Sequence, residues 1–347
     1  MRTSMSPEPG YYINSTRLGD GCRHVFIDAG SNRGVHVRFL TEPRAFPHSR
    51  YLNAWRFFQN AFGEGFADDA TICAFGFEPN PAHTARLDAL GLRLRAHGRR
   101  VEFFHAALSN HTGSISFTRG DGISSDWGFR ASPMPRANYK RHAKRASDEQ
   151  QQQQNDAGRA EPSPQVVHVP LIDLGRFVAD ELVARQLPQD RLSGGDTPPA
   201  RPPAIVMKMD VEGGEYDALT RLASLNVLCQ IDVLSLEVHN LGWARLNASS
   251  LDAPASARLA TFQEAMWQTH EPLWRTFAAL EPPEGTGWGA LQPFVERATR
   301  SRARGAPHQR HQQHDMRTAS SGCRTRVFLR DDESYLLVPD VPRGEWS

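Results

Sequence analysis

The 347-residue sequence lacks the features that mark several common classes of protein. Its net charge is only +1, so no overall excess of charge favours nucleic acid or an anionic membrane as a partner. It has no apolar run of the length that a membrane-spanning helix requires. We therefore expect no nucleic-acid partner and no direct insertion of this chain into a membrane. The composition leaves the oligomeric state open.

Cysteine is also scarce. The four cysteines lie far apart without a C-x-x-C pair, at Cys22, Cys73, Cys229 and Cys323. This spacing argues against a zinc site and against a dense disulfide framework. Cys73 and Cys229 fall within strand-like segments, and we expect them to be small buried hydrophobic residues. The residues His308, His311 and His314 recur at every third position, but without acidic or cysteine partners. We predict no metal site.

The N-terminal segment has no apolar core of the kind found in signal peptides, because residues 1–24 are mainly polar. Three N-x-[ST] sequons nevertheless occur, at Asn14, Asn110 and Asn247. The expected compartment is the cytoplasm by default. The secretory pathway remains an alternative if an N-terminal anchor is missing from this chain.

The two commonest phosphate-binding patterns are absent, and a different glycine pattern takes their place. The segment Val25–Gly34 reads V-F-I-D-A-G-S-N-R-G, which matches neither G-x-G-x-x-G nor G-x-x-x-x-G-K-[ST]. An apolar run ending in Asp28 is typical of a buried parallel strand. Gly30 and Gly34 lack a Cβ, so the backbone there can approach a ligand closely. The segment predicts a strand-to-helix turn beside a nucleotide-like molecule.

Strand-like and helix-like segments alternate along the chain, which predicts an α/β fold with a parallel sheet covered by helices. The expected strands span His24–Ala29, Thr71–Glu78, Val101–Leu108, Gly113–Thr118, Val166–Val169, Ile205–Asp210 and Ile231–Val238. The expected helices span Ser49–Phe62, Ala82–Leu90 and Leu171–Leu187, with helical spacing again over Leu259–Phe277. Two last strands, Arg326–Arg330 and Ser334–Val338, flank a turn and predict an antiparallel pair at the sheet edge.

The organisation predicts one domain over residues 24–340, preceded by an N-terminal extension over residues 1–23. Polar segments interrupt this domain at about 142–165, 188–203 and 298–322. These segments are poor in the apolar residues that a packed core needs, so we expect insertions or disordered loops there.

Acidic residues follow three of the predicted strands: Asp28, Glu78 and Asp210. In a doubly wound sheet, ligands bind at the carboxyl ends of the strands, so these side chains are expected to converge on one crevice. A carboxylate can accept hydrogen bonds from both hydroxyls of a ribose, which is the role we favour for Glu78. The alternative is that Glu78 caps the helix that follows Pro79.

Five motifs in order resemble the FkbM-type family of S-adenosylmethionine-dependent methyltransferases, whose pattern is roughly D-x-G-A-N-x-G, F-E-P-N-P and K-x-D-x-E-G-x-E. The motifs cover about residues 24–240 and are Val25–Gly34, Phe75–Pro81 (F-G-F-E-P-N-P), Ala106–Asn110 with Gly113, Val169–Asp173 (V-P-L-I-D), and Val206–Glu215 (V-M-K-M-D-V-E-G-G-E). The resemblance implies a Rossmann-like, seven-stranded methyltransferase sheet, mostly parallel with an antiparallel last strand and helices on both faces.

The same resemblance implies S-adenosyl-L-methionine as the cofactor and assigns residues to it. The first turn would line the methionine end through Asp28, Gly30, Asn32 and Gly34, together with Ser31, which stands where the family usually has alanine. Glu78, followed by Pro79, would hold the ribose, Ala107 would border the adenine, and Asp210 would lie beside the sulfonium or the acceptor. The long region 240–322 departs from the family, and the acceptor site would be built there.

Methyl transfer to a hydroxyl requires positioning of the acceptor and removal of its proton. Asp210 and His239 are the candidate general bases, because both follow predicted strands at the same sheet edge, although His239 could equally be a packing or capping residue. Lys208 could orient Asp210 or the acceptor, or simply form a structural salt bridge. Glu215 is expected to stabilise a helix N-terminus before it serves catalysis.

The resulting hypothesis is an S-adenosylmethionine-dependent methyltransferase that acts on oxygen of a small-molecule or glycan acceptor. The preference for oxygen comes from the resemblance alone. One alternative is an N-methyltransferase acting on a peptide or protein, and another is a catalytically silent Rossmann-like binding module. The complete set of Asp28, Gly30, Asn32, Gly34 and Glu78 argues against the silent module.

Overall fold

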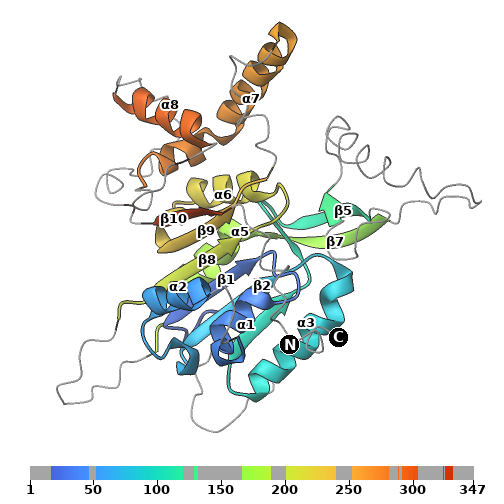
Figure 1. The fold of residues 1–347 in the computed structure, drawn as a ribbon, viewed down its shortest axis with the longest axis vertical. Coiled ribbons are helices and arrows are strands. Elements are labelled where there is room, and N and C mark those ends of the chain that lie inside the picture. Colours follow the sequence, from blue (N-terminus) through green and yellow to red (C-terminus); the bar gives the residue numbers. More distant parts are fainter. Residues whose placement is uncertain are drawn as a thin grey trace, which may run out of the picture.

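The computed structural model describes residues 17–46, 52–119, 129–131, 166–188, 201–239, 252–280, 288, 291–303, 323 and 325–330. Within these residues the chain forms a six-stranded main sheet and a four-stranded small sheet. Figure 1 shows strands β5 and β7 of the small sheet extending away from the main sheet, and helices α7 and α8 lying beyond the side of the main sheet that β10 forms. The predicted α/β class with a parallel sheet and helices is confirmed.

The main sheet has the strand order β10-β9-β8-β1-β2-β3, and every neighbouring pair is parallel. Its strands are β1 (His24–Ala29), β2 (Ile72–Phe77), β3 (Arg100–Phe104), β8 (Ala204–Met209), β9 (Val233–Glu237) and β10 (Arg326–Arg330). The chain runs outward from β1 through β2 to β3, and then returns to β8 on the other side of β1. This reversal lies between β1 and β8, where ligands of doubly wound sheets bind at the carboxyl ends.

The central strands are buried on both faces, which explains their continuous apolar sequences. All six residues of β1 are buried, and alternate side chains enter two different cores. Val25 and Ile27 pack with side chains of α5, α6, α7 and α8, whereas Phe26 packs with side chains of α1, α2 and α3. Helices therefore cover both faces of the main sheet, as the alternation of strands and helices predicts.

The α-helices are α1 (Val35–Thr41), α2 (Leu52–Phe62), α3 (Thr84–Ala96), α5 (Leu174–Arg176), α6 (Glu215–Ser224), α7 (Ala253–Phe277) and α8 (Gln292–Ala303). The shorter helical turns are η1 (Pro43–Ala45), η2 (Phe66–Asp68), η3 (Pro81–His83), the π-helical η4 (Phe177–Val183) and η5 (Leu228–Gln230). A kink at His270, two residues before Pro272, divides α7. Among the described residues we find no helix with the length and apolar character to cross a bilayer.

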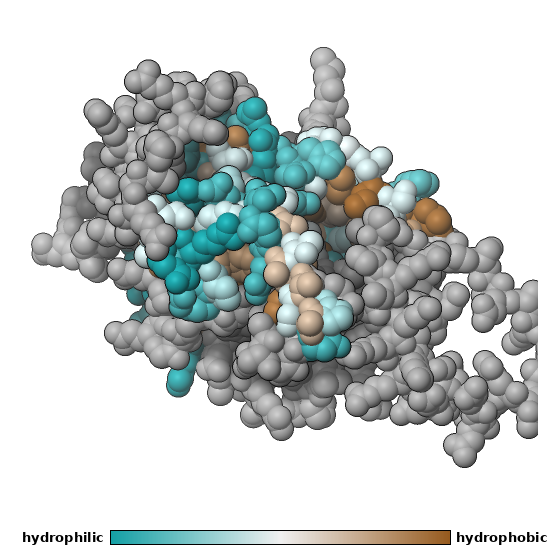
Figure 2. Space-filling view, turned by 90° about the horizontal axis from the view of Figure 1, so that it is seen from above, coloured by the Kyte–Doolittle hydropathy of each residue, from teal (hydrophilic) through white to brown (hydrophobic). Residues whose placement is uncertain are grey.

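Helix α2 confirms the helix predicted near Ser49–Phe62. Phe58 and Phe62 on this helix are buried, whereas Trp55 is 46% exposed. The surface at the end of the molecule that bears α7 and α8 is largely hydrophilic among its described residues, with only small separate hydrophobic areas (Figure 2).

The small sheet has the order β4-β7-β5-β6 and contains β4 (Ala107–Ser109), β5 (Gly113–Arg119), β6 (Phe129–Ala131) and β7 (Val166–Asp173). Its existence corrects two predictions. The single strand predicted over Val101–Leu108 is two strands, β3 and β4, which belong to different sheets. The helix predicted from Leu171 begins only at Leu174, because β7 continues to Asp173, whose side chain then accepts a hydrogen bond from the Arg176 backbone N–H at 3.0 Å.

All four cysteines are in disulfides, Cys22–Cys73 and Cys229–Cys323. The prediction of a small buried residue within a strand is confirmed for Cys73, which is 1% exposed in β2, but it is wrong for Cys229, which is exposed in the helical turn η5. The sequence analysis predicted neither of the two disulfides. The residues of each pair are 51 and 94 positions apart in the sequence, so only the tertiary fold brings their Cα atoms within 5.7 and 4.9 Å.

Several predicted boundaries differ from the structure. Residues 17–23 of the predicted extension pack on the domain, since Asp20 accepts a hydrogen bond from the Gln186 backbone N–H at 2.8 Å. Helix α8 continues to Ala303, so it overlaps the insertion predicted from residue 298. The predicted strand Ser334–Val338, and with it the antiparallel pair, lies outside the described residues.

Candidate functional site

The carboxyl ends of β1, β2, β8 and β9 bring the acidic residues of the predicted crevice together. The Lys208 ammonium lies 3.2 Å from Asp210 Oδ2 and 3.9 Å from Asp28 Oδ1. His239 Nε2 lies 3.7 Å from Asp210 Oδ1, and Glu78 accepts a hydrogen bond from the turn that follows Asp28. The convergence that the strand ends predict is thus observed as one connected set of contacts.

The turn after β1 requires glycine at two positions. Gly30 has φ 81°, and a Cβ at this residue would lie 1.8 Å from the backbone oxygen of Asp210. Gly34 has φ 76°, and its Cβ would lie 2.6 Å from a methyl carbon of Leu90 in α3. L-residues other than glycine rarely adopt such angles. The glycines therefore let the turn lie directly against β8 and α3.

Glu78 holds the turn after β1 to the turn after β2. Its Oε2 accepts a hydrogen bond from the Asn32 backbone N–H at 2.6 Å, and its Oε1 accepts one from the Asn80 backbone N–H at 2.8 Å. Burial raises the pKa of Glu78 to about 7, although the two backbone donors act in the opposite direction. The 3-10 helix that follows is capped by Asn80, whose Oδ1 accepts from the Ala82 N–H at 3.0 Å, and not by Glu78.

Asp28 is completely buried, with 0% of its surface exposed. Neither of its carboxylate oxygens accepts a hydrogen bond within the described part of the chain; the Lys208 ammonium lies 3.9 Å and the His36 ring 3.6 Å from Asp28 Oδ1. Burial raises the pKa of Asp28 to about 6, and Lys208 limits this rise. Asp28 thus positions its neighbours instead of presenting its oxygens to solvent.

Ser31 shares this supporting position, because it is also buried and its hydroxyl donates to the Asp28 backbone oxygen at 2.9 Å. Gly30 and Asn32 in the same turn are partly exposed. Asn32 has φ 49°, an uncommon angle for a residue other than glycine, and its side-chain oxygen is buried without a hydrogen-bond partner among the described residues. Gly30 and Asn32, with the partly exposed Arg33, form the accessible surface of the turn.

Lys208 connects the turn after β1 with the residues that follow β8. Its ammonium donates to the backbone oxygen of Gly30 at 2.7 Å and to Asp210 Oδ2 at 3.2 Å. The residue is 8% exposed. These contacts support two of the roles predicted for Lys208, the structural salt bridge and the orientation of Asp210.

His239 lies among four carboxylates. Its Nδ1 is 2.5 Å from Glu215 Oε1, and its Nε2 is 3.5 Å from Glu237 and 3.9 Å from Glu212. Burial lowers the pKa of His239, but Glu215, Glu237 and Glu212 outweigh this effect and raise the pKa to about 11. At neutral pH the imidazole therefore already carries its proton, which disfavours His239 as the general base.

The loop between β8 and α6 has its own unusual backbone. Glu212 has φ 55°, and Gly213 has φ 104°. Glu215 is fully buried at the start of α6, where its Oε1 accepts a hydrogen bond from the Val211 backbone N–H at 3.3 Å. Non-glycine residues at such angles cluster at functional sites. Glu215 lies in the first turn of α6, as predicted, but its side chain makes no cap hydrogen bond to the helix N-terminus and instead holds the preceding loop and His239.

One oxygen or nitrogen of each of Asp210, Glu212 and His239 lies within 4.8 Å of the others, a separation that a metal ion could bridge. A metal would have to displace the proton from His239 Nε2. The prediction of no metal is not tested by this geometry.

Sequence reasoning missed Glu237, although its position two residues before His239 at the end of a strand was a usable indication.

Two predicted cofactor residues lie at the rim of this set. Pro79 follows β2 and is partly exposed. Ala107 begins β4, and the next residue, Leu108, has its backbone oxygen 3.7 Å from the position of a Cβ on Gly214. Strand β4 thus lies beside the N-terminus of α6, on the same side of the molecule as Asp210.

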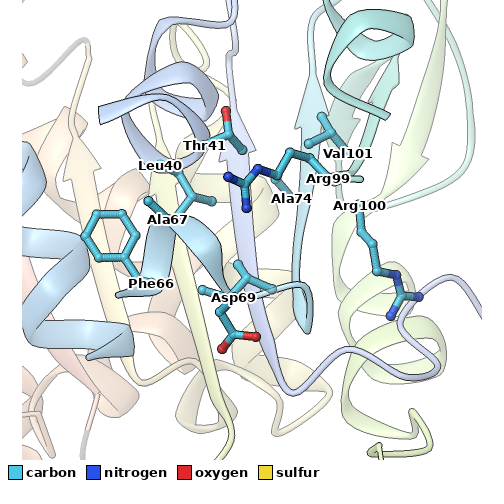
Figure 3. A pocket seen from close by; sticks show the side chains of 10 residues that line it. Leu40, Thr41, Phe66, Ala67, Asp69, Ala74, Arg99, Arg100 and Val101 are labelled. Atoms are coloured by element: carbon cyan, nitrogen blue, oxygen red, sulfur yellow. The ribbon is translucent and has the colours of Figure 1, made fainter. Parts of the chain in front are cut away.

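A small recess lies elsewhere, at the amino ends of β2 and β3 (Figure 3). It is lined by Leu40, Thr41, Phe66, Ala67, Asp69, Ile72, Ala74, Arg99, Arg100 and Val101. None of the candidate residues belongs to it. Because doubly wound sheets bind ligands at the carboxyl edge, we assign no ligand to this recess.

Comparisons with protein-family models, with curated proteins and with solved structures found no match. The geometry of the strand ends and the motifs in the sequence are therefore the features of this chain that bear on its function.

Proposed function

We propose that the chain is an S-adenosylmethionine-dependent methyltransferase of the FkbM type, acting on a hydroxyl of a small molecule or glycan. The observation that carries the proposal is the meeting of four strand ends at the point where the sheet order reverses. There the glycine turn after β1, the ribose-binding candidate Glu78 and the acidic cluster around Asp210 are connected by hydrogen bonds and ion pairs. The resemblance of five ordered motifs supports the same activity.

The residues fit the proposed cofactor at several positions. The backbone at Gly30 and Asn32 is accessible, and the buried side-chain oxygen of Asn32 has no donor among the described residues, so it suits the ammonium of a methionine moiety. Glu78 keeps acceptor capacity for ribose hydroxyls beyond its two backbone donors. Asp28 would act indirectly, by fixing Lys208 and the turn. When bound, the cofactor supplies an electrophilic methyl group.

Asp210 is the residue best placed to accept the proton of an acceptor hydroxyl. One of its oxygens is held by Lys208, and the other faces His239 at 3.7 Å. The protonated His239 and Lys208 balance part of the negative charge of the cluster, so the Asp210 carboxylate is oriented at the edge of the crevice. Glu212 is the most exposed carboxylate beside it, with 31% of its side chain accessible.

The alternative acceptor is an amine on a peptide or protein. Asp210, Glu212 and Glu237 give the crevice an acidic rim, which would attract a cationic group. Comparing the methylation of hydroxyl and amine acceptors by the purified protein would separate the two classes.

Calorimetric titration with S-adenosylhomocysteine, with nicotinamide dinucleotides as controls, tests the proposal directly. We expect micromolar binding of S-adenosylhomocysteine alone. Measured above pH 7, where Glu78 is ionised, Glu78→Gln should weaken this binding by about tenfold or more, since it removes one charged acceptor worth about 1.5–3 kcal/mol. Glu264→Gln, on the exposed face of α7, is the matched control and should bind as the unmodified protein does. A folded protein that binds none of these compounds would support the silent binding module instead.

A further inference from the structure

The two disulfides bear on where this chain folds. They use all four cysteines of the sequence, and each joins segments that are distant in the chain. Disulfides persist in oxidising compartments and are rare where glutathione keeps thiols reduced. The cysteine pairing therefore favours the secretory pathway over the cytoplasmic default that the sequence predicts.

One of the three sequons, at Asn110, lies on the surface, as a glycosylation site must. Asn110, His111 and Thr112 form the connection between β4 and β5, and all three residues are exposed. The connection carries the chain past the end of β7, because β4 and β5 pair with opposite edges of that strand. Asn14 and Asn247 lie outside the described residues.

The side chains of the connection leave the reactive atom available. Asn110 Oδ1 lies 2.7 Å from His111 Nδ1 and 3.4 Å from the Ser109 hydroxyl, so the carboxamide oxygen, and not its nitrogen, takes part in these contacts. The nitrogen is the atom that glycosylation modifies. A surface turn with Thr at the second position after Asn is what the acceptor pattern requires.

We propose that this protein folds in the oxidising lumen of the secretory pathway and carries an N-linked glycan on Asn110. In the transfer, the Asn110 carboxamide nitrogen forms a bond to the anomeric carbon of a lipid-linked oligosaccharide. The bond from that carbon to the pyrophosphate oxygen breaks, the lipid pyrophosphate leaves, and the amide gives up one proton. This inference is independent of the proposed methyltransferase activity.

The test uses the full-length protein isolated from its own cells, alkylated without reduction and digested. Mass spectrometry should find the Asn110 peptide carrying an oligosaccharide, and all four cysteines unalkylated. Asn110→Gln and Thr112→Ala should abolish the modification, whereas Thr112→Ser should retain it. Asn226 is the matched control within the chain, because it is exposed but is followed by Val227 and Leu228, and it should be unmodified.

Two results would overturn the proposal. The first is an unmodified Asn110 peptide in protein whose disulfides are intact. The second is alkylated cysteines in the freshly isolated protein, which would show that the chain is kept reduced. Because Asn110 is exposed, Asn110→Gln should fold normally, and its denaturant unfolding compared with that of the unmodified protein serves as the check on its fold.

Discussion

The two loops that frame the candidate site have similar backbones but hold their carboxylates differently. The β1–α1 turn contains Asn32 at φ 49°, and the β8–α6 loop contains Glu212 at φ 55°. Beside the first turn, Glu78 is held by backbone N–H groups, whereas beside the second, Asp210 is held by Lys208 and faces His239. The first region therefore depends on the shape of the backbone, and the second depends on charge.

The largest expected effect comes from a substitution in the turn after β1, the region that depends on the shape of the backbone. Gly30→Ala places a methyl group where the Asp210 backbone oxygen lies, and we expect it to lower the free energy of unfolding by more than about 3 kcal/mol. Gly65→Ala is the matched control, since Gly65 has φ 75° with nothing within 4 Å of its Cβ position, and should cost only about 1–2 kcal/mol. Denaturant unfolding measures both, and equal losses would show that the close approach to β8 is unimportant.

Replacing Lys208 should remove the contact that links the two regions. Lys208→Met leaves the buried Asp28 without its closest balancing charge on β8, and we expect a loss of about 3–5 kcal/mol in the free energy of unfolding. The exposed pair Glu264–Arg297 provides the comparison, because solvent screens it and Glu264→Gln should leave the free energy of unfolding nearly unchanged. Similar effects of the two substitutions in chemical denaturation would contradict the assignment of Lys208 as the link.

The two regions should contribute to stability over different ranges of pH. Glu78 and Asp28 have pKa values raised to about 7 and about 6, so their protonated forms stabilise the fold at low pH and this contribution is lost as the pH rises through those values. His239 has its pKa raised to about 11, so its contribution is complete below its ordinary value of 6.5 and is lost as the pH rises towards 11.

Two variants test this division. Glu78→Gln should flatten the fall in stability between about pH 4.5 and 7, and His239→Gln should flatten only the fall above about pH 6.5. The slope of unfolding free energy against pH should change by at most about 1.4 kcal/mol per pH unit for each group. If both variants alter the same range, the distinction between a backbone-held and a charge-held region fails.

Much of the main sheet could be predicted because its signals are local. Strand β1 has the predicted bounds His24–Ala29, since a run of apolar residues followed by a glycine turn identifies a buried parallel strand. The division of Val101–Leu108 between two sheets could not be predicted, because both halves favour extended structure and only tertiary pairing separates them.

In the candidate site, the meeting of three strand-end carboxylates could be predicted, but Glu237 was missed and the electrostatics of the cluster could not be predicted. Strand ends indicate that Asp28, Glu78 and Asp210 meet, but not that Asp28 is completely buried. The raised pKa of His239 depends on Glu215 and Glu237, which reach it from α6 and β9. Disulfide partners likewise depend on the distance between Cα atoms in the fold, which the spacing of cysteines in a sequence does not reveal.

The Cys229–Cys323 disulfide also makes a covalent ring of the chain between these residues, a segment that includes β9, α7 and α8. A protease that cuts once within this ring cannot release either piece, because the sulfur bridge still joins them. The nicked protein would keep its mass on a non-reducing gel and divide into two bands only after reduction. Helices α7 and α8 thus belong to a part of the molecule that can tolerate a break in its backbone without losing covalent continuity.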